Sequence, residues 1–320
     1  MEQLNGVLAR LLAYDKNQMP RIESGTLTPP ELIKDMSSDD YFADRTRMNS
    51  SAIKKILKSP RHFLADWKSE DEEDEADHFR IGRAAHLMLL EPDKFRQLHV
   101  VEPEFIGVTK DGKPTKNPNA IDVKNQREEW RSKQSPQALI LTEEEVGNLV
   151  GMIESVLEHP IANSMLKKGV AESVIKWTDR DTGVMCKGKP DYLTFEDNKD
   201  FHLIDFKTSR NIQSGVFMRD IVNLQYHLSM AFYADGLLEV YGRLPSTLTI
   251  FPVEKTPPYE AAVFVLDDDW YDIGRRMYKD GLELYKKCID SGKWPAFSSK
   301  AEAMSMPQWA QDYSAPEFKF

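Results

Sequence analysis

The residues best suited to chemistry lie near the middle of the 320-residue chain, where Pro190-Asp191 is followed after thirteen residues by Asp205-Phe206-Lys207. Asp205 lies in an apolar run, and a carboxylate placed there needs a partner or a metal ion. Two neighbouring carboxylates suit Mg²⁺, a hard cation that prefers carboxylate, water and phosphate oxygens; Mn²⁺ is the alternative ion. Lys207 would share the face of Asp205, two residues earlier, and could position a water molecule or stabilise charge at a phosphorus centre.

A β-hairpin would bring these groups together. Two largely apolar segments, residues 188–195 and 201–208, flank a polar turn. Asp191 and Asp205 are equally distant from Asn198, so a simple register places them opposite each other, with Cβ atoms about 5 Å apart. The alternative is a solvated hairpin edge, because D-x-K triplets are common.

The composition is that of an ordinary globular protein, with 41% hydrophobic and 29% charged residues. Two cysteines cannot form a disulfide framework or a four-cysteine iron–sulfur site. We expect no transmembrane helix, no secretory signal and no membrane partner, and therefore a cytoplasmic location. The net charge of −10 argues against coating nucleic acid with the whole surface, but a local basic groove could still hold DNA.

Two predicted helices carry further candidates. Asn49 or Ser50 caps a helix whose basic face includes Lys54, which either contacts a phosphate or is simply solvated. Residues 79–90 form an apolar helix in which His86 follows Gly82 by one turn. A lone histidine in such a helix is more often a core residue than a functional one. Basic residues that could contact a DNA backbone are Lys54, Arg61, Arg80 and Arg83.

The remaining pattern predicts a mixture of helices and strands. Residues 109–119 are expected to form a loop, and Thr142 opens a helix through a capping box. Glu172 could reach the metal, but it is more readily interpreted as an exposed residue of a strand at 171–177. Further elements are expected as a helix at 216–238, strands at 246–253 and 261–266, and a helix at 267–291. Residues 1–44 are interpreted as a helical appendage, and residues 45–320 as the main domain.

The chain from about residue 45 to 315 resembles the C-terminal nuclease domain of RecE, exodeoxyribonuclease VIII, in the RecB-like branch of the PD-(D/E)XK nucleases. Residues 1–44 have no clear counterpart. The matching segments are Ser50-Ser51-Ala52-Ile53-Lys54, Ile81-Gly82-Arg83-Ala84-Ala85-His86, Asp181-Thr182-Gly183, Cys186-Lys187-Gly188-Lys189-Pro190-Asp191, Asp205-Phe206-Lys207-Thr208, Tyr226-His227, Ala231-Phe232-Tyr233-Ala234-Asp235-Gly236, Trp294-Pro295-Ala296 and Met306-Pro307-Gln308-Trp309-Ala310.

The resemblance implies a restriction-endonuclease-like α/β core, in which helices flank a central mixed β-sheet. It implies His86, Asp191 and Asp205 as metal ligands and Lys207 as a catalytic residue. We add the Phe206 carbonyl oxygen to the expected ligands. The family usually has a glutamine where Ser229 stands, and Gln225, one helical turn earlier, is the candidate replacement. The expected DNA-binding residues are Ser50, Lys54, Arg61, Arg80, Arg83, Gln225 and Tyr226.

The family activity is Mg²⁺-dependent digestion of linear duplex DNA from the 5′ end, which leaves a 3′ single strand. The resemblance further implies a toroidal homo-oligomer, a trimer or a tetramer, and an annealing partner of the RecT or Beta type in a phage or bacterial setting. Two other functions are consistent with the sequence. One is an endonuclease or repair nuclease of the same superfamily, and the other is a DNA-binding protein with a degenerate nuclease fold.

Overall fold

The computed structural model describes residues 31–33, 36–68, 77–167, 169–196, 200–298, 300–301 and 303–306. The apolar repeat at Leu4, Val7 and Leu11 and the last matching segment of the family, beyond Met306, lie outside the described residues. Among the described helices, none is both long and apolar enough to cross a membrane.

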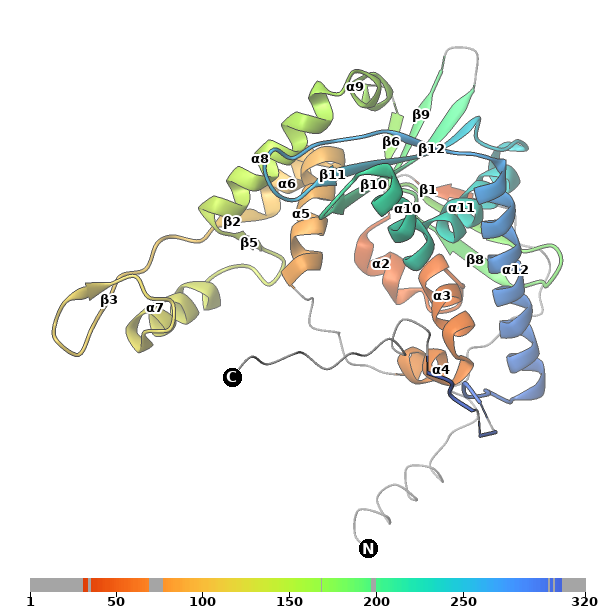
Figure 1. Ribbon diagram of the computed structural model, residues 1–320, viewed down its shortest axis with the longest axis horizontal. Helices are drawn as coiled ribbons and strands as arrows, with labels where there is room; N and C mark the ends of the chain where they lie inside the picture. Colours follow the sequence, from red (N-terminus) through yellow and green to blue (C-terminus); the bar gives the residue numbers. More distant parts are fainter. Residues whose placement is uncertain are drawn as a thin grey trace, which may run out of the picture.

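A five-stranded mixed sheet lies at the centre of the molecule (Figure 1), in the order β12-β11-β10-β9-β6. Its strands are β6 (Gly169–Ala171), β9 (Tyr192–Phe195), β10 (Phe201–Ser209), β11 (Thr247–Glu254) and β12 (Phe264–Leu266). Strands β10 and β11 run parallel, whereas the other neighbours are antiparallel. The mixed α/β fold with a central sheet is therefore confirmed.

The central hairpin has the predicted register. Leu203 pairs with Leu193, and Ile204 pairs with Tyr192, so the next position along would set Asp205 opposite Asp191. The first arm is shorter than predicted, however. Its expected start belongs to a separate strand, β8 (Met185–Gly188), which pairs with β7 (Val174–Thr178) in a three-stranded sheet completed by β1 (Glu31–Ile33). The chain changes sheet at Pro190, which has no N–H to donate to a ladder.

Helices cover both faces of the central sheet. Because side chains alternate along β10, Leu203 packs into one apolar cluster and Ile204 and Phe206 pack into the other. The first cluster includes α3 (Ser50–Lys58), α11 (Tyr226–Tyr241) and α12 (Asp268–Ser291); the second includes α5 (Asp77–Leu90) and α8 (Glu143–Glu158). The other helices are α2 (Ser38–Ala43), α4 (Pro60–Lys68), α6 (Pro92–Leu98), α7 (Ile121–Ser132), α9 (Pro160–Leu166) and α10 (Ser214–Asn223).

Two predicted elements are wrong, because each contains a sharp break. The helix expected at 216–238 is divided into α10 and α11 at Gln225, whose φ of 53° is left-handed. The strand expected at 171–177 is divided into β6 and β7 at Glu172, whose φ is 52°. Left-handed backbone is costly for residues other than glycine, so propensity gives no warning of it. By contrast, the predicted Asn49 cap, the Thr142 capping box, β11 and α12 are confirmed.

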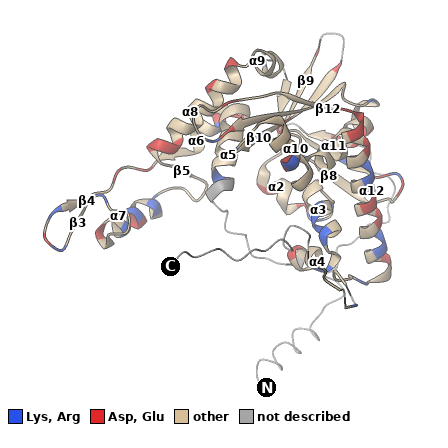
Figure 2. Ribbon diagram, in the orientation of Figure 1, with Lys and Arg blue, Asp and Glu red and all other residues tan. Residues whose placement is uncertain are grey.

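An arm projects from the body between α6 and α8 (Figure 1). It contains β3 (Gly107–Val108), β4 (Pro114–Thr115) and α7, so the predicted loop at 109–119 includes one side of a short hairpin. Strands β2 (His99–Val101) and β5 (Leu139–Leu141) join it to the body as a parallel pair. Lys and Arg residues occur on α3, whereas charges of both signs lie on the arm and along α12 (Figure 2).

A buried carboxylate joins helices α11 and α12. Asp235, 8% exposed, accepts hydrogen bonds from the hydroxyls of Tyr271 and Tyr278, and its Oδ2 lies 2.8 Å from Nε of Arg275. We predict that Asp235→Asn lowers the free energy of unfolding by about 3 kcal/mol, because buried donors lose their charged acceptor. Asp272→Asn, at an exposed position of α12, is the matched control in urea unfolding. Equal stability of the two variants would contradict this role.

Candidate active site

The candidate site lies where one strand of the central sheet ends before its neighbour. The β9–β10 ladder ends at Tyr192, whereas β10 continues to Ser209 alongside β11. The last part of β10 therefore has an open edge. Asp191, the residue before β9, occupies it, and its Oδ2 accepts the Phe206 N–H at 2.8 Å. This backbone bond fixes one carboxylate beside the strand that carries the other.

Lys207 joins the two carboxylates. Its Nζ lies 2.7 Å from Oδ2 of Asp205 and 3.4 Å from Oδ2 of Asp191, and it also donates to the Phe206 carbonyl at 3.0 Å. Burial alone would favour a neutral amine, but the two carboxylates raise the pKa of Lys207 far above its usual value. Burial raises the pKa of Asp205. Lys207 is therefore protonated, and Asp191 and Asp205 hold its ammonium group in place.

His86 reaches the same edge from helix α5. Its Nδ1 lies 3.5 Å from Oδ2 of Asp191, and its ring meets Phe206 edge to face at 5.0 Å. Burial, followed by the charge of Lys207, lowers the pKa of His86 to about 3. The imidazole is therefore neutral at physiological pH, which is the form that binds a metal ion. The structure thus places His86 beside the carboxylates, not in a closed apolar core.

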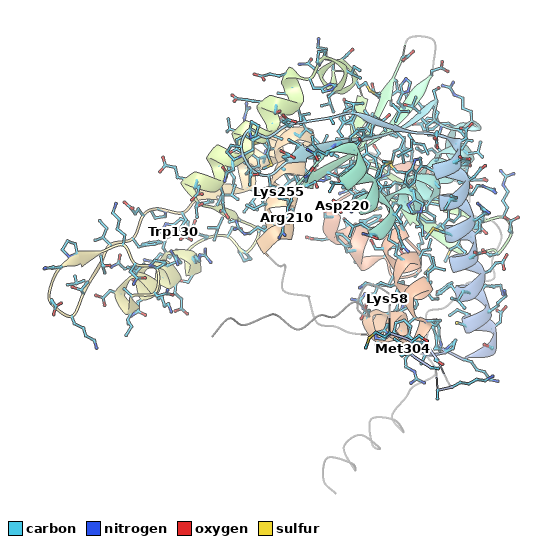
Figure 3. All side chains as sticks on the ribbon, in the orientation of Figure 1. Lys58, Trp130, Arg210, Asp220, Lys255 and Met304 are labelled. Atoms are coloured by element: carbon cyan, nitrogen blue, oxygen red, sulfur yellow. The ribbon has the colours of Figure 1, made fainter. Side chains whose placement is uncertain are left out.

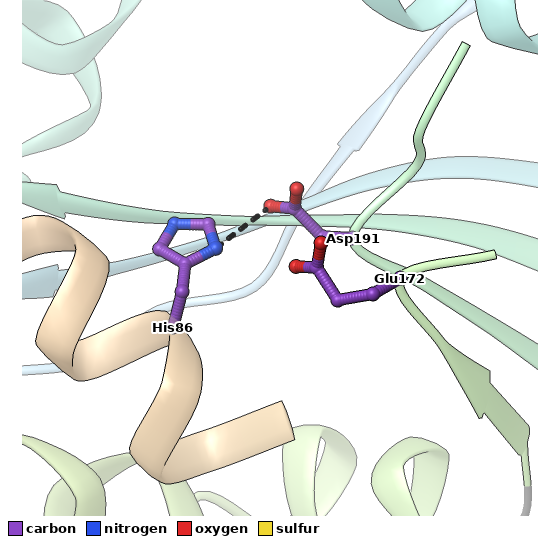
Figure 4. Close-up of side chains that lie close together, drawn as sticks. All are labelled: His86, Glu172 and Asp191. Atoms are coloured by element: carbon purple, nitrogen blue, oxygen red, sulfur yellow. Dashed lines mark ion pairs between the residues drawn. The ribbon is translucent and has the colours of Figure 1, made fainter. Parts of the chain in front are cut away.

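Glu172 completes the cluster (Figure 4), although the sequence favoured an exposed strand position over a role at the metal. Its side chain is half-buried, at 19% exposure, and Lys189 lies 2.7 Å away. One ligand atom each of His86, Glu172 and Asp191 lies within 4.8 Å of the others. Burial and then the charge of Asp191 raise the pKa of Glu172 to about 7. The expectation of an exposed strand residue is wrong because the chain breaks at Glu172 and directs its side chain to the open edge.

These donors suit a divalent metal ion. Carboxylates are ligands that suit Mg²⁺ and Mn²⁺, and a neutral imidazole is a ligand typical of transition-metal sites. Asp205, bound to Lys207, lies next to this group rather than within it. The Phe206 carbonyl accepts from Lys207. The structure therefore brings together all the residues predicted as metal ligands, with Glu172 as an additional donor.

Some predicted DNA contacts surround this site on the α3 and α11 side. The ring of Tyr226 lies 5.5 Å from Nζ of Lys207 and 5.9 Å from Nζ of Lys54. Lys54 donates to the Leu224 carbonyl at 2.9 Å, and burial lowers its pKa to about 8. Gln225 begins α11 in its left-handed conformation. Lys54, Gln225 and Tyr226 are therefore partly buried residues that line one side of the site, beside Lys207.

The other predicted contacts have different surroundings. Ser50 is buried, and its hydroxyl lies 3.3 Å from that of Tyr233. Arg80 forms an ion pair with Glu145 and donates to the Ile140 carbonyl at 2.9 Å, so it joins α5 to α8 and β5. Arg61 and Arg83 are exposed, on α4 and α5 respectively.

Comparison with known proteins agrees with this arrangement. Residues 49–307 match a family described as a PDDEXK-like domain of unknown function (DUF3799). No curated protein matches the chain. A crystal structure named "Putative exonuclease" from Eubacterium rectale aligns with a TM-score of 0.56 at 9% identity, covering 85% of this chain and 96% of that one. The protein SSO0001 aligns at 13% identity, covering 73% of this chain and 84% of that one. Its TM-score of only 0.26 is too low to indicate a shared fold.

We predict that Glu172→Gln weakens Mn²⁺ binding by tenfold or more, because removing even a group that supports a metal ligand commonly costs about that much. The substitution keeps the size of the side chain but replaces a charged carboxylate with a neutral amide. Isothermal titration calorimetry with Mn²⁺ and Mg²⁺ measures the effect without any substrate. Glu158→Gln, at an exposed end of α8, is the control. If Glu172→Gln binds Mn²⁺ with wild-type affinity, Glu172 is not a metal ligand.

Proposed function

Because the chain belongs to the PDDEXK-like domain family of unknown function (DUF3799), we propose that it is a metal-dependent deoxyribonuclease that degrades linear duplex DNA from the 5′ end and leaves 3′ single strands. One observation carries the proposal. The carboxylates of Asp191 and Asp205, the ammonium of Lys207 and the imidazole of His86 converge at the open edge of β10. This combination suits the hydrolysis of a phosphodiester better than it suits simple binding.

We propose a different role for each side chain of the site. His86, Asp191 and Glu172 would hold Mg²⁺, and Asp205 would hold Lys207 beside them. A bound Mg²⁺ supplies a more acidic water and neutralises phosphate charge. Since its carboxylate neighbours keep Lys207 protonated, this residue acts as a hydrogen-bond donor and a positive charge toward the phosphate or the attacking water.

The finer parts of the proposal rest on the family resemblance. The substrates are the ends of double-stranded DNA, and the partner is a single-strand annealing protein of the RecT or Beta type. The working form is a toroidal trimer or tetramer in the cytoplasm of a bacterial cell, encoded by a phage or another mobile element. Because the whole chain has a net charge of −10, we expect a local group of basic residues, and not the whole surface, to contact the DNA.

We predict that the purified protein with Mg²⁺ degrades a linear duplex, leaves covalently closed circular DNA intact, and is inactive in EDTA. Labels at the 5′ and 3′ ends of one strand show the direction, since 5′-to-3′ digestion releases the 5′ label first. Lys207→Ala should lower the rate roughly 10²- to 10³-fold, because one charged donor to the reacting phosphate is lost.

Lys286→Ala is the control for this experiment, because Lys286 lies on α12 and pairs with Asp290 within the same helix. Cleavage of the circle would instead indicate an endonuclease. Binding of DNA without cleavage of either substrate would indicate a binding protein of the same fold. Release of the 3′ label first would contradict the proposed direction.

A further inference from the structure

Two cations lie side by side just beyond the ends of the two parallel strands. Ser209 is the last residue of β10 and pairs with Glu254 of β11, so Arg210 and Lys255 are the next residues on neighbouring strands. The Lys255 N–H donates to the Ser209 carbonyl at 2.9 Å, which continues the ladder to this point. Adjacent strands are separated by about 4.8 Å, so the two basic side chains start close together.

Both side chains enter the same hollow, which has a volume of about 360 Å³. Its other lining residues are Ile81, Glu145 and Asn148, from α5 and α8. Figure 3 places Arg210 next to Lys255, in the region between Trp130 of the arm and Lys58 of α3. Crevices beyond the carboxyl ends of parallel strands are common ligand sites in open α/β sheets.

The charges in this hollow favour an anion. Glu145 is its acidic residue, but that carboxylate is bound by Arg80 and accepts the Thr142 N–H at 2.8 Å. Among the described residues, no carboxylate forms an ion pair with Arg210. Burial, and then the charge of Arg210, lowers the pKa of Lys255, so the charged form of Lys255 is less stable beside Arg210. An anion between them would relieve that repulsion.

Another hollow, with a larger volume, gives a useful contrast. It has a volume of about 760 Å³ and lies near the start of β10, beside Thr194, His202 and Thr247. Its lining contains Glu196 but no lysine or arginine. Size alone therefore does not mark the place where an anion would bind.

The position of the cation pair relates it to the candidate active site. Arg210 follows Lys207 by three residues, about 10 Å of extended backbone, and lies on the α5 and α8 face from which His86 reaches the site, whereas Lys207 lies beside Tyr226 of α11 on the other face. Helix α5 runs beside this stretch, with Gly82 near Thr208 and His86 near Phe206. Phosphates of one strand recur every 3.4 Å along a duplex, so about 10 Å corresponds to one to three nucleotides.

We propose that Arg210 and Lys255 form a second phosphate-binding site, which holds a phosphate of the cleaved strand one to three nucleotides from the scissile bond. The inference rests on the proposed nuclease function and adds to it the contact that sets where the strand is cut. The ligand is a phosphate group, either the monoester at a 5′ end or a diester within the strand.

The test uses the full chain and duplex oligonucleotides that carry either a 5′-phosphate or a 5′-hydroxyl. Binding is measured by fluorescence anisotropy in EDTA over a range of NaCl concentrations. We predict that Arg210→Gln with Lys255→Gln weakens binding about tenfold and reduces the slope of log K against log salt by about one to two, because one or two phosphate contacts are lost. Arg210→Lys should restore part of the affinity.

The matched control is Arg96→Gln, because Arg96 is 78% exposed on α6 and pairs with Asp93. A loss confined to the 5′-phosphorylated duplex identifies the monoester, and an equal loss on both duplexes identifies a diester; either supports the site. An unchanged salt slope in the double variant overturns it, provided that the variant melts like the wild type. If the wild type degrades DNA but the slope is unchanged, only this inference fails. If the slope falls but no DNA is degraded, the proposed function fails and the phosphate site stands.

Discussion

The structure depends on a local imbalance of charge at the open edge of β10. Three carboxylates, those of Glu172, Asp191 and Asp205, face two ammonium groups, those of Lys189 and Lys207. His86 is held neutral by burial and adds no positive charge. Lys54 adds a third cation near Asp205, but burial and then the charge of Asp191 still raise the pKa of Glu172 to about 7, so a negative charge at Glu172 is costly. A divalent cation would remove that cost, so the same repulsion that destabilises the metal-free site favours metal binding.

This imbalance exists because the fold leaves one strand edge open. Pro190 ends the path from β8, the chain turns, and β9 starts only at Tyr192, so the end of β10 has no partner on that side. The open edge is reached from both helical layers. His86 comes from α5 on one face, and Tyr226 comes from α11 on the other. A longer β9 would cover the edge and separate His86 from Asp191, although each residue type would be unchanged.

The sequence predicted what depends on local pattern. Alternation and the symmetric spacing about the turn gave the register of Asp191 and Asp205, and cap chemistry gave the ends of α3 and α8. The sequence pattern does not show which residues far apart in the chain lie in contact. Periodicity left His86 between a core and a functional role, and the family resemblance assigned it to the site. Glu172 was not favoured as a ligand because its left-handed backbone divides an apparently continuous strand. Gln225 divides an apparently continuous helix in the same way.

The two charged sites share one rigid support. Lys207 belongs to β10 and Arg210 follows it directly, while Lys255 is joined to the Ser209 carbonyl by the last bond of the β10–β11 ladder. Arg210 and Lys255 directly follow two strands that are hydrogen-bonded to each other, so the ladder restricts the distance between them. An acidic protein can thus bind a polyanion with few basic residues, provided that the sheet sets their positions. In the proposed function, the central sheet would set the distance between the phosphate held by Arg210 and Lys255 and the phosphate at Lys207.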